Sequence, residues 1–181
     1  EHSFPTRRSS DLARAAAFGT VQASYAALDD GIAGNLAGGT HHAFRDRGEA
    51  YCLFNDIAIA ITLLRAEGRV RRPFVLDLDV HQGNGTAVMF ADEPDVFTYS
   101  MHGRHNYPTR KEISSLDVEL DDGANDHQVL DALHQTVPDA LGDMCGPTSS
   151  TSDPVTGNGS STCDRRISRD GRIVDVLGHM H

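Results

Sequence analysis

Apolar residues recur at helical spacing in three stretches of the chain. Such a period places one stripe of side chains on one face of a helix. The stripes are Ala17, Val21, Ser24, Tyr25 and Leu28; Phe54, Ile57, Ile61 and Leu64; and Leu130, Leu133, Val137 and Leu141. They predict helices over residues 13–30, 51–67 and 127–141. Gly68 is a good terminator for the second helix, and Pro138 would kink or cut the third.

Two shorter apolar runs lie between the second and third helices. Residues 73–80 and 95–101 are predicted strands, and residues 86–91 form a short helix between them. An acidic stretch over residues 117–126 is predicted to be a solvated strand and turn. Strands that alternate with helices indicate an α/β fold with a parallel sheet.

The end of the first strand carries the strongest chemical signal. Side chains two apart share a face of a strand, so Asp77, Asp79 and His81 project to one side. The apolar residues Leu76, Leu78 and Val80 lie on the other side. Burying unpaired charge is costly, and a divalent metal resolves that conflict. The alternative is an edge strand with a solvated polar face and a glycine turn.

Two further segments carry candidate chemistry. His41 and His42 follow Gly38-Gly39, and imidazole is well suited to move protons near neutral pH. They are candidates for an acid/base pair, although adjacent histidines are also common on surfaces. Residues 102–108 follow the second strand at its carboxyl end and are predicted to form a rim loop of the same crevice, or a solvated loop.

The composition of the chain argues against several classes of partner and compartment. The chain has 181 residues, a formal net charge of −10 and a pI of about 5.3. That charge argues against nucleic acid as a partner, and no apolar run is long enough to cross a membrane. Cys52, Cys145 and Cys163 are far apart and form no Cys-x-x-Cys pair, so we expect a reduced, cytoplasmic compartment without a disulfide framework.

The ends of the chain are unlike its middle. Residues 1–12 resemble a translated sequencing adapter and lack the apolar region of a signal peptide. We treat them as an artefact without function; the alternative is a polar arm. Residues 13–158 are interpreted as a partial catalytic domain. Residues 159–181 are interpreted as a divergent or frameshifted tail of that domain.

Four segments together resemble the histone deacetylase family. They are Gly38-Gly39-Thr40-His41-His42-Ala43, Cys52-Leu53-Phe54-Asn55-Asp56, Asp77-Leu78-Asp79-Val80-His81-Gln82-Gly83-Asn84-Gly85 and Arg104-His105-Asn106-Tyr107-Pro108. Their order and spacing are most similar to the class IV branch and its bacterial relatives. The resemblance implies a three-layer parallel sheet with helices on both faces, of the arginase/deacetylase type. It also implies a zinc-dependent hydrolase that removes acetyl or other acyl groups from lysine.

The resemblance assigns expected roles to single residues. Asp79, His81 and Asp153 correspond to the zinc ligands. His42 corresponds to the general base and later acid, and His41 to a supporting electrostatic group. The remaining assignments are Asp77 as partner of His41, Asn84 as partner of His42, Tyr51 as a wall of the acyl-lysine tunnel and His102 as a substrate contact. Other members carry Asp in place of Asn84, which would leave His42 less basic here. The backbone near Asp77 and Asp79 also resembles the family's K⁺ site.

The carboxyl-terminal part departs from the family. An apolar strand should precede Asp153, but residues 145–151 read as loop, and local frameshifts would explain this. The family's early segment, late glycine-rich loop and oxyanion-stabilising Tyr have no counterpart, so a core fragment is expected. The alternatives are an acetylpolyamine-type amidohydrolase, an inactive truncated product, or a two-manganese ureohydrolase. The last would need Asp where Gly83 stands.

Overall fold

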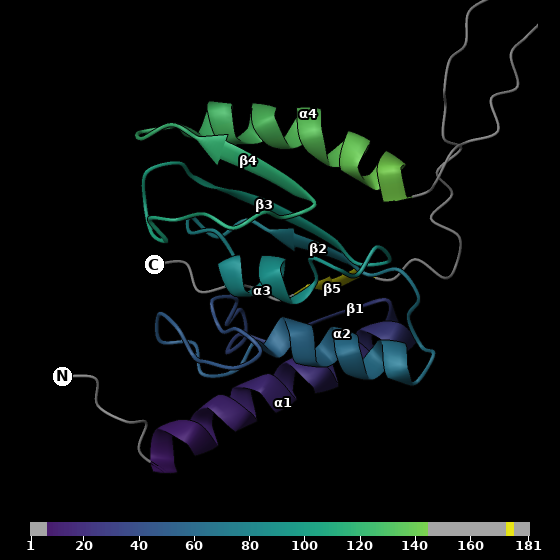
Figure 1. The fold of residues 1–181 in the computed structure, drawn as a ribbon. Coiled ribbons are helices and arrows are strands. Elements are labelled where there is room, and N and C mark those ends of the chain that lie inside the picture. Colours follow the sequence, from purple (N-terminus) through teal and green to yellow (C-terminus); the bar gives the residue numbers. More distant parts are fainter. Residues whose placement is uncertain (1–6, 145–172, 176–181) are drawn as a thin grey trace, which may run out of the picture. The chain divides into compact units, whose positions relative to one another are not determined.

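The computed structural model describes residues 7–144 and 173–175 (Figure 1). Its helices are α1 (Arg7–Asp30), α2 (Asp56–Ala66), α3 (Asn84–Met89) and α4 (Asp126–Met144). Its strands are β1 (Ile32–Gly34), β2 (Phe74–Asp77), β3 (Phe97–Gly103), β4 (Leu116–Leu120) and β5 (Ile173–Asp175). In these described ranges no helix has the length and apolar character needed to cross a bilayer. The chain divides into two units, residues 1–124 with 172–181 and residues 125–171.

The three strand pairs among the described residues are parallel. β3 lies between β2 and β4, with Phe74 opposite Phe97 and Tyr99 opposite Leu116. β1 pairs separately with β5, with Ile32 opposite Ile173. The parallel pairing brings the carboxyl ends of β2, β3 and β4 to one edge of the sheet, where ligands bind in folds of this class. The predicted α/β class with a parallel sheet is confirmed.

β2 ends at Asp77, earlier than the predicted strand over 73–80. The Asp77 carboxylate accepts a hydrogen bond from the Asp79 backbone N–H at 3.0 Å, and the Asp79 carboxylate accepts one from the His81 N–H at 2.7 Å. Such side-chain-to-backbone bonds compete with a strand ladder and turn the chain. The apolar residues of the opposite side are about half exposed: Leu76 43%, Leu78 48% and Val80 52%.

The helices exist as predicted, but several bounds differ. α1 starts at Arg7 rather than near residue 13. α2 starts at Asp56 rather than residue 51, because Asn55 caps it by accepting a bond from the Ala58 N–H at 2.9 Å. Pro138 was predicted to kink or cut the third helix, and the cut does not occur. α4 continues through it, since a proline removes only one backbone bond from a helix of 19 residues.

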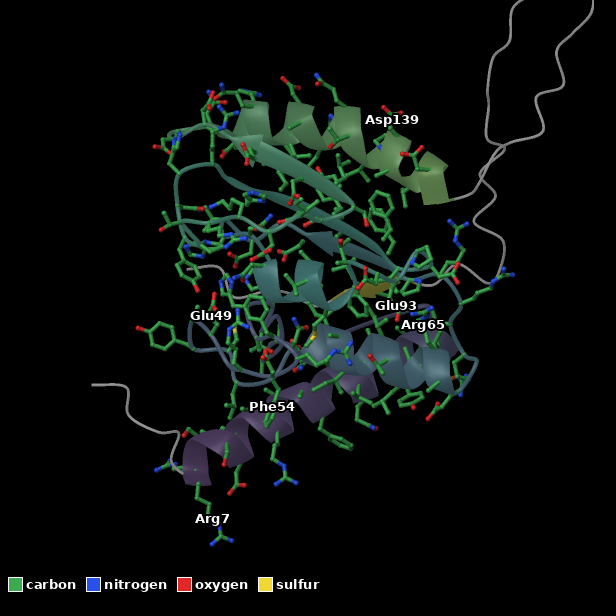
Figure 2. The ribbon with its side chains drawn as sticks, in the orientation of Figure 1. Arg7, Glu49, Phe54, Arg65, Glu93 and Asp139 are labelled. Atoms are coloured by element: carbon green, nitrogen blue, oxygen red, sulfur yellow. The ribbon has the colours of Figure 1, made fainter. Side chains whose placement is uncertain are left out.

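α2 packs on β2 through a small apolar core. The cluster consists of Ala58, Ile61, Val75, Phe90 and Val96, with Ile57 and Met89 beside it. At its border the Arg65 guanidinium of α2 lies 2.9 Å from the Glu93 carboxylate (Figure 2). α1 lies along α2 (Figure 1), so both helices are fixed next to the segment that leads into the tandem histidines.

One buried carboxylate joins these helices to that segment. Asp56, at the start of α2, is fully buried and accepts a hydrogen bond from the Thr20 hydroxyl of α1. It also accepts bonds from the Gly39 N–H at 3.0 Å, the Thr40 N–H at 2.8 Å and the Thr40 hydroxyl at 2.7 Å. Four donors thus satisfy a charge that would otherwise be costly to bury.

We expect Asp56→Asn to destabilise the fold. The amide replaces one oxygen that accepts two of the four bonds, and each buried donor left without a partner costs about 1–3 kcal/mol. Urea denaturation of the 181-residue chain should show a loss of about 3 kcal/mol. Glu67→Gln is the control, because Glu67 is exposed and accepts one bond, from Tyr25; its effect should stay within about 0.5 kcal/mol. Equal effects of the two substitutions would contradict the role of Asp56.

Candidate active site

The tandem histidines sit in a tightly held loop. His41 and His42 are 5% and 6% exposed. The His41 carbonyl accepts a bond from the Thr86 N–H of α3 at 3.1 Å. The Asn55 side-chain amide donates to the Ala43 carbonyl at 3.3 Å. The loop is therefore fixed between the starts of α2 and α3.

Two glycines allow α3 to approach this loop. A Cβ atom on Gly83 would lie 2.3 Å from Asp77 Oδ2, and one on Gly85 would lie 2.3 Å from the Ala43 carbonyl oxygen. Real Cβ atoms do not tolerate such distances, and the second neighbour is backbone. The glycines of the Gln82-Gly83-Asn84-Gly85 motif are thus needed for close approach, which brings Asn84 against His42.

Each histidine has its own partner on the other segment. His41 Nδ1 lies 2.6 Å from Asp77 Oδ2, and His42 Nδ1 lies 2.7 Å from Asn84 Oδ1. The two imidazole rings are 4.1 Å apart between centroids and tilted by 51°. The structure therefore brings together the two histidines and the two partners, Asp77 and Asn84, that the family resemblance assigns to them.

The two histidines have pKa values that are shifted in opposite directions. Burial lowers the pKa of His41, but the hydrogen bond and charge of Asp77, helped by Asp79 and Asp56, outweigh it and hold that pKa above its ordinary value. Burial and the neighbouring His41 lower the pKa of His42, and the Asn84 bond opposes them only in part. Near neutral pH His42 is the unprotonated member of the pair and can accept a proton.

The candidate metal ligands lie beside this pair. His81 Nδ1 is 3.2 Å from Asp79 Oδ1, which in turn is 3.9 Å from His41 Nε2. Two ligand atoms on one tetrahedral zinc ion are about 3.3 Å apart, so this donor pair fits a shared ion. Within residues 7–144 and 173–175 no group of three His, Cys, Asp or Glu side chains gathers for a metal. The third predicted ligand, Asp153, lies outside the described residues.

Sequence reasoning missed two residues next to His42. The Tyr107 ring packs edge-on to His42, with centroids 5.0 Å apart, and lies 6.1 Å from the His81 ring. Its hydroxyl donates to Glu49 Oε1 at 2.7 Å, and the Asn84 side-chain amide donates to the same oxygen at 2.8 Å. Tyr107 stands in a quoted motif, but Glu49 lies in a stretch that gave no signal.

Tyr107 and Glu49 both have shifted pKa values. Burial and the bond to Glu49 raise the pKa of Tyr107 to about 12, so its hydroxyl remains protonated and donates. Burial raises the pKa of Glu49, but the bonds from Tyr107 and Asn84 and the charge of Arg47 outweigh it and lower that pKa below its ordinary value. The Glu49 side chain is therefore a carboxylate at neutral pH.

Tyr51 occupies a tight turn rather than the predicted helix. Glu49 and Cys52 exchange backbone hydrogen bonds of 2.9 and 2.8 Å across it. Ala50 and Tyr51 both have positive φ, 47° and 66°, as two-residue hairpin turns require. The Tyr51 side chain is fully exposed, while Cys52 is buried. The turn presents the Tyr51 ring to solvent next to the histidine site.

The prediction that His102 lies in a rim loop was wrong. β3 extends to Gly103, and His102 is only 1% exposed within it. Its Nδ1 lies 3.0 Å from the Ser100 hydroxyl. Burial lowers the pKa of His102, and its Nε2 has no hydrogen-bond partner among the described residues. A side chain inside the sheet offers little surface to a substrate.

Gln82 and Lys111 hold the loop that carries Tyr107 without lying in the site themselves. The buried Gln82 amide bonds both backbone groups of Glu112, at 2.7 and 2.8 Å, and donates to Asp117 at 2.8 Å. The Lys111 ammonium donates to the Asn106 carbonyl at 2.7 Å and the Pro108 carbonyl at 2.8 Å. These bonds hold the loop that carries Tyr107 against the site.

Comparisons with known proteins agree with this geometry. A family model described as the histone deacetylase domain matches residues 1–147. An uncharacterized protein of Picosynechococcus is 45% identical over 131 residues, covering 68% of this chain and 44% of that protein. A probable deacetylase of Methanothermobacter thermautotrophicus is 44% identical over 100 residues, covering 55% and 30%.

A solved structure gives the same result. The crystal structure of a histone deacetylase homologue from Aquifex aeolicus superposes with a TM-score of 0.62 at 32% identity, covering 68% of this chain and 36% of that one. The chain thus spans less than half the length of these relatives. The motifs, the parallel sheet and these matches together show that the chain belongs to the histone deacetylase family.

Proposed function

We propose that this chain is the catalytic core of a zinc-dependent hydrolase that removes acetyl, or other acyl, groups from lysine side chains. One observation carries the proposal. Two buried imidazoles, whose pKa values are shifted in opposite directions, lie beside an Asp79–His81 pair spaced for one metal ion. An amide bond needs a base, an acid and an electrophile to be cleaved. Here one histidine can serve as base and then acid, and the Asp79–His81 pair can hold a metal ion as the electrophile.

Zinc is the proposed cofactor, held by Asp79 and His81 with Asp153 as the third ligand. Carboxylate and imidazole are its usual donors, and three protein ligands leave a position for water and substrate. When bound, zinc polarises the amide carbonyl and lowers the pKa of the attacking water. A K⁺ ion beside the backbone of Asp77 and Asp79 is a further proposal, which rests on resemblance alone.

His42 is the proposed general base and then the general acid. Its Nδ1–H is donated to Asn84, so Nε2 carries the free lone pair and takes the proton from water as the C–O bond forms. The same Nε2–H then protonates the departing lysine nitrogen as the C–N bond breaks. Asp77 raises the pKa of His41, and His41 in its protonated form would stabilise the negative charge that develops on the carbonyl oxygen.

Tyr51 is the proposed substrate contact. Its exposed ring projects from a turn whose other end carries Glu49, a residue bonded to the catalytic Asn84. The aliphatic stem of an acyl-lysine can pack against such a ring, whether the lysine belongs to a protein or the substrate is a small acetylated amine. His102, inside β3, is not among the proposed substrate contacts.

Activity is tested on an extended protein, in which this chain is completed with the segments its relatives carry beyond the match. A fluorogenic acetyl-lysine peptide and an acetylated polyamine are assayed in parallel with zinc supplied. Turnover of the peptide supports the proposal, and turnover of the polyamine alone shifts it to small amines. A zinc-loaded protein that turns over neither substrate would refute it.

We expect Asp79→Ala and His81→Ala each to abolish stoichiometric zinc binding by the extended protein, because each removes one of three donors. Metal content after dialysis, measured by mass spectrometry, should fall from about one zinc per chain to near zero. Asp95→Ala is the control, since Asp95 is an exposed carboxylate that faces Arg65 and Arg72. Full zinc occupancy in both test variants would exclude these ligands.

We expect His42→Ala to retain zinc and to lose at least about a hundredfold in kcat, the usual scale for a general acid–base residue. The matched control is His105→Ala, because His105 is an exposed histidine paired with Asp122. Its kcat should be unchanged. If the His42→Ala variant kept near wild-type turnover, another group would have to be the base.

We expect the 181-residue chain itself to show little or no deacetylase activity with zinc supplied. Its described residues bring only two zinc donors together, and a metal held by two donors is weakly bound and poorly aligned. The measurement compares this chain with the extended protein in the same peptide assay. Comparable turnover from both would show that Asp153 and the tail complete the site unaided.

A further inference from the structure

The Glu49 carboxylate extends the His42–Asn84 pair by one member. Glu49 Oε1 accepts the Asn84 side-chain N–H at 2.8 Å while Asn84 Oδ1 faces His42 Nδ1 at 2.7 Å. Figure 2 shows Glu49 beside the first turn of α3, where Asn84 lies. The three side chains form a continuous hydrogen-bonded row from the imidazole to a carboxylate.

An amide alone cannot fix the state of an imidazole. Asn84 can present either its oxygen or its NH₂ group to His42, depending on a half-turn of the amide. With the oxygen at His42, the proton sits on Nδ1 and Nε2 is free to accept. With the NH₂ group at His42, the proton moves to Nε2 and the base is lost.

Glu49 removes that ambiguity, because a carboxylate only accepts hydrogen bonds. An Asn84 oxygen turned toward Glu49 would meet a negative charge, so only the observed orientation is favourable. We propose that Glu49 is a positioning residue that orients the Asn84 amide and thereby holds His42 in the tautomer with a free Nε2. The tautomer stands on this geometry, while its catalytic meaning rests on the proposed function.

Glu49 is itself held in place from three sides. Its backbone pairs with Cys52 across the turn, and Arg47 Nε lies 3.7 Å from Oε2. The Tyr107 hydroxyl, which can only donate while it bonds a carboxylate, occupies the second site on Oε1 at 2.7 Å. The Tyr107 ring also packs on His42, so Tyr107 contacts both the first and the last member of the His42–Asn84–Glu49 row.

The proposal is tested by NMR on the 181-residue chain labelled with ¹⁵N-histidine. Long-range ¹H–¹⁵N spectra distinguish the two neutral tautomers, and His42→Gln identifies the His42 signals. The wild type should show His42 with its proton on Nδ1. Glu49→Ala and Glu49→Gln should each populate the other tautomer, because alanine offers no acceptor and the glutamine amide can donate as well as accept.

Tyr107→Phe is the matched control. It removes the other bond to Glu49 Oε1 but leaves the Asn84 bond, so the His42 tautomer should be unchanged. An unaltered tautomer in Glu49→Ala, or a mixture of tautomers in the wild type, would overturn the proposal. If Glu49→Ala does not fold, the Asn84 side-chain amide decides, observed in uniformly ¹⁵N-labelled protein. The Asn84 side-chain proton that bonds Glu49 should shift upfield in Glu49→Gln, because the bond to a charged acceptor is lost. An unchanged chemical shift would overturn the proposal.

The catalytic consequence is measured separately on the extended protein. Glu49→Ala should lower kcat about tenfold, the lower range for partners behind a catalytic ligand, with KM and zinc content unchanged. Glu49→Gln should lower kcat to a similar extent, because its amide no longer excludes the flipped Asn84 orientation. A tautomer that depends on Glu49 in a protein without deacetylase activity would refute the proposed function and leave this inference standing.

Discussion

The buried Asp56 carboxylate is the interaction on which the site depends. It collects donors from α1 and from the backbone of Gly39 and Thr40, directly before the tandem histidines. Its neighbour Asn55 caps α2 and binds the Ala43 carbonyl, directly after them. Both flanks of a two-residue segment are thus anchored to one helix start. Backbone groups without such partners would have to face water and open the loop.

The two histidines show how a fold differentiates identical side chains. Both are buried next to each other, and both are bonded through Nδ1 to a residue of the Asp77–Gly85 segment. The partner of His41 is a carboxylate, so a full negative charge lies directly beside that ring. The partner of His42 is an amide, and the nearest charge in its hydrogen-bonded row is Glu49, one residue further away. The first ring therefore keeps a proton that the second releases.

The elements and the central residues could be predicted because their signals are local. Helical stripes, strand runs and the motifs around His41 and Asp77 stand within short windows of sequence. The bounds failed where side chains override periodicity, as at the turns made by Asp77 and Asp79 and at the Asn55 cap. Glu49 and Tyr107 escaped notice because they are 58 residues apart and meet only in the fold. Asp153, the proposed third zinc ligand, lies outside the described residues.

The half-exposed row of Leu76, Leu78 and Val80 has a practical consequence. Leu76 lies in β2 and the other two residues follow it, and β2 is an edge strand of the described three-stranded sheet. An apolar edge of this kind is a template for pairing with another chain. At high concentration the 181-residue polypeptide should therefore tend to self-associate through this strand, so its unfolding curves and spectra are best recorded on dilute samples. Dilute, cold handling or a charged fusion partner is the appropriate starting point for purification.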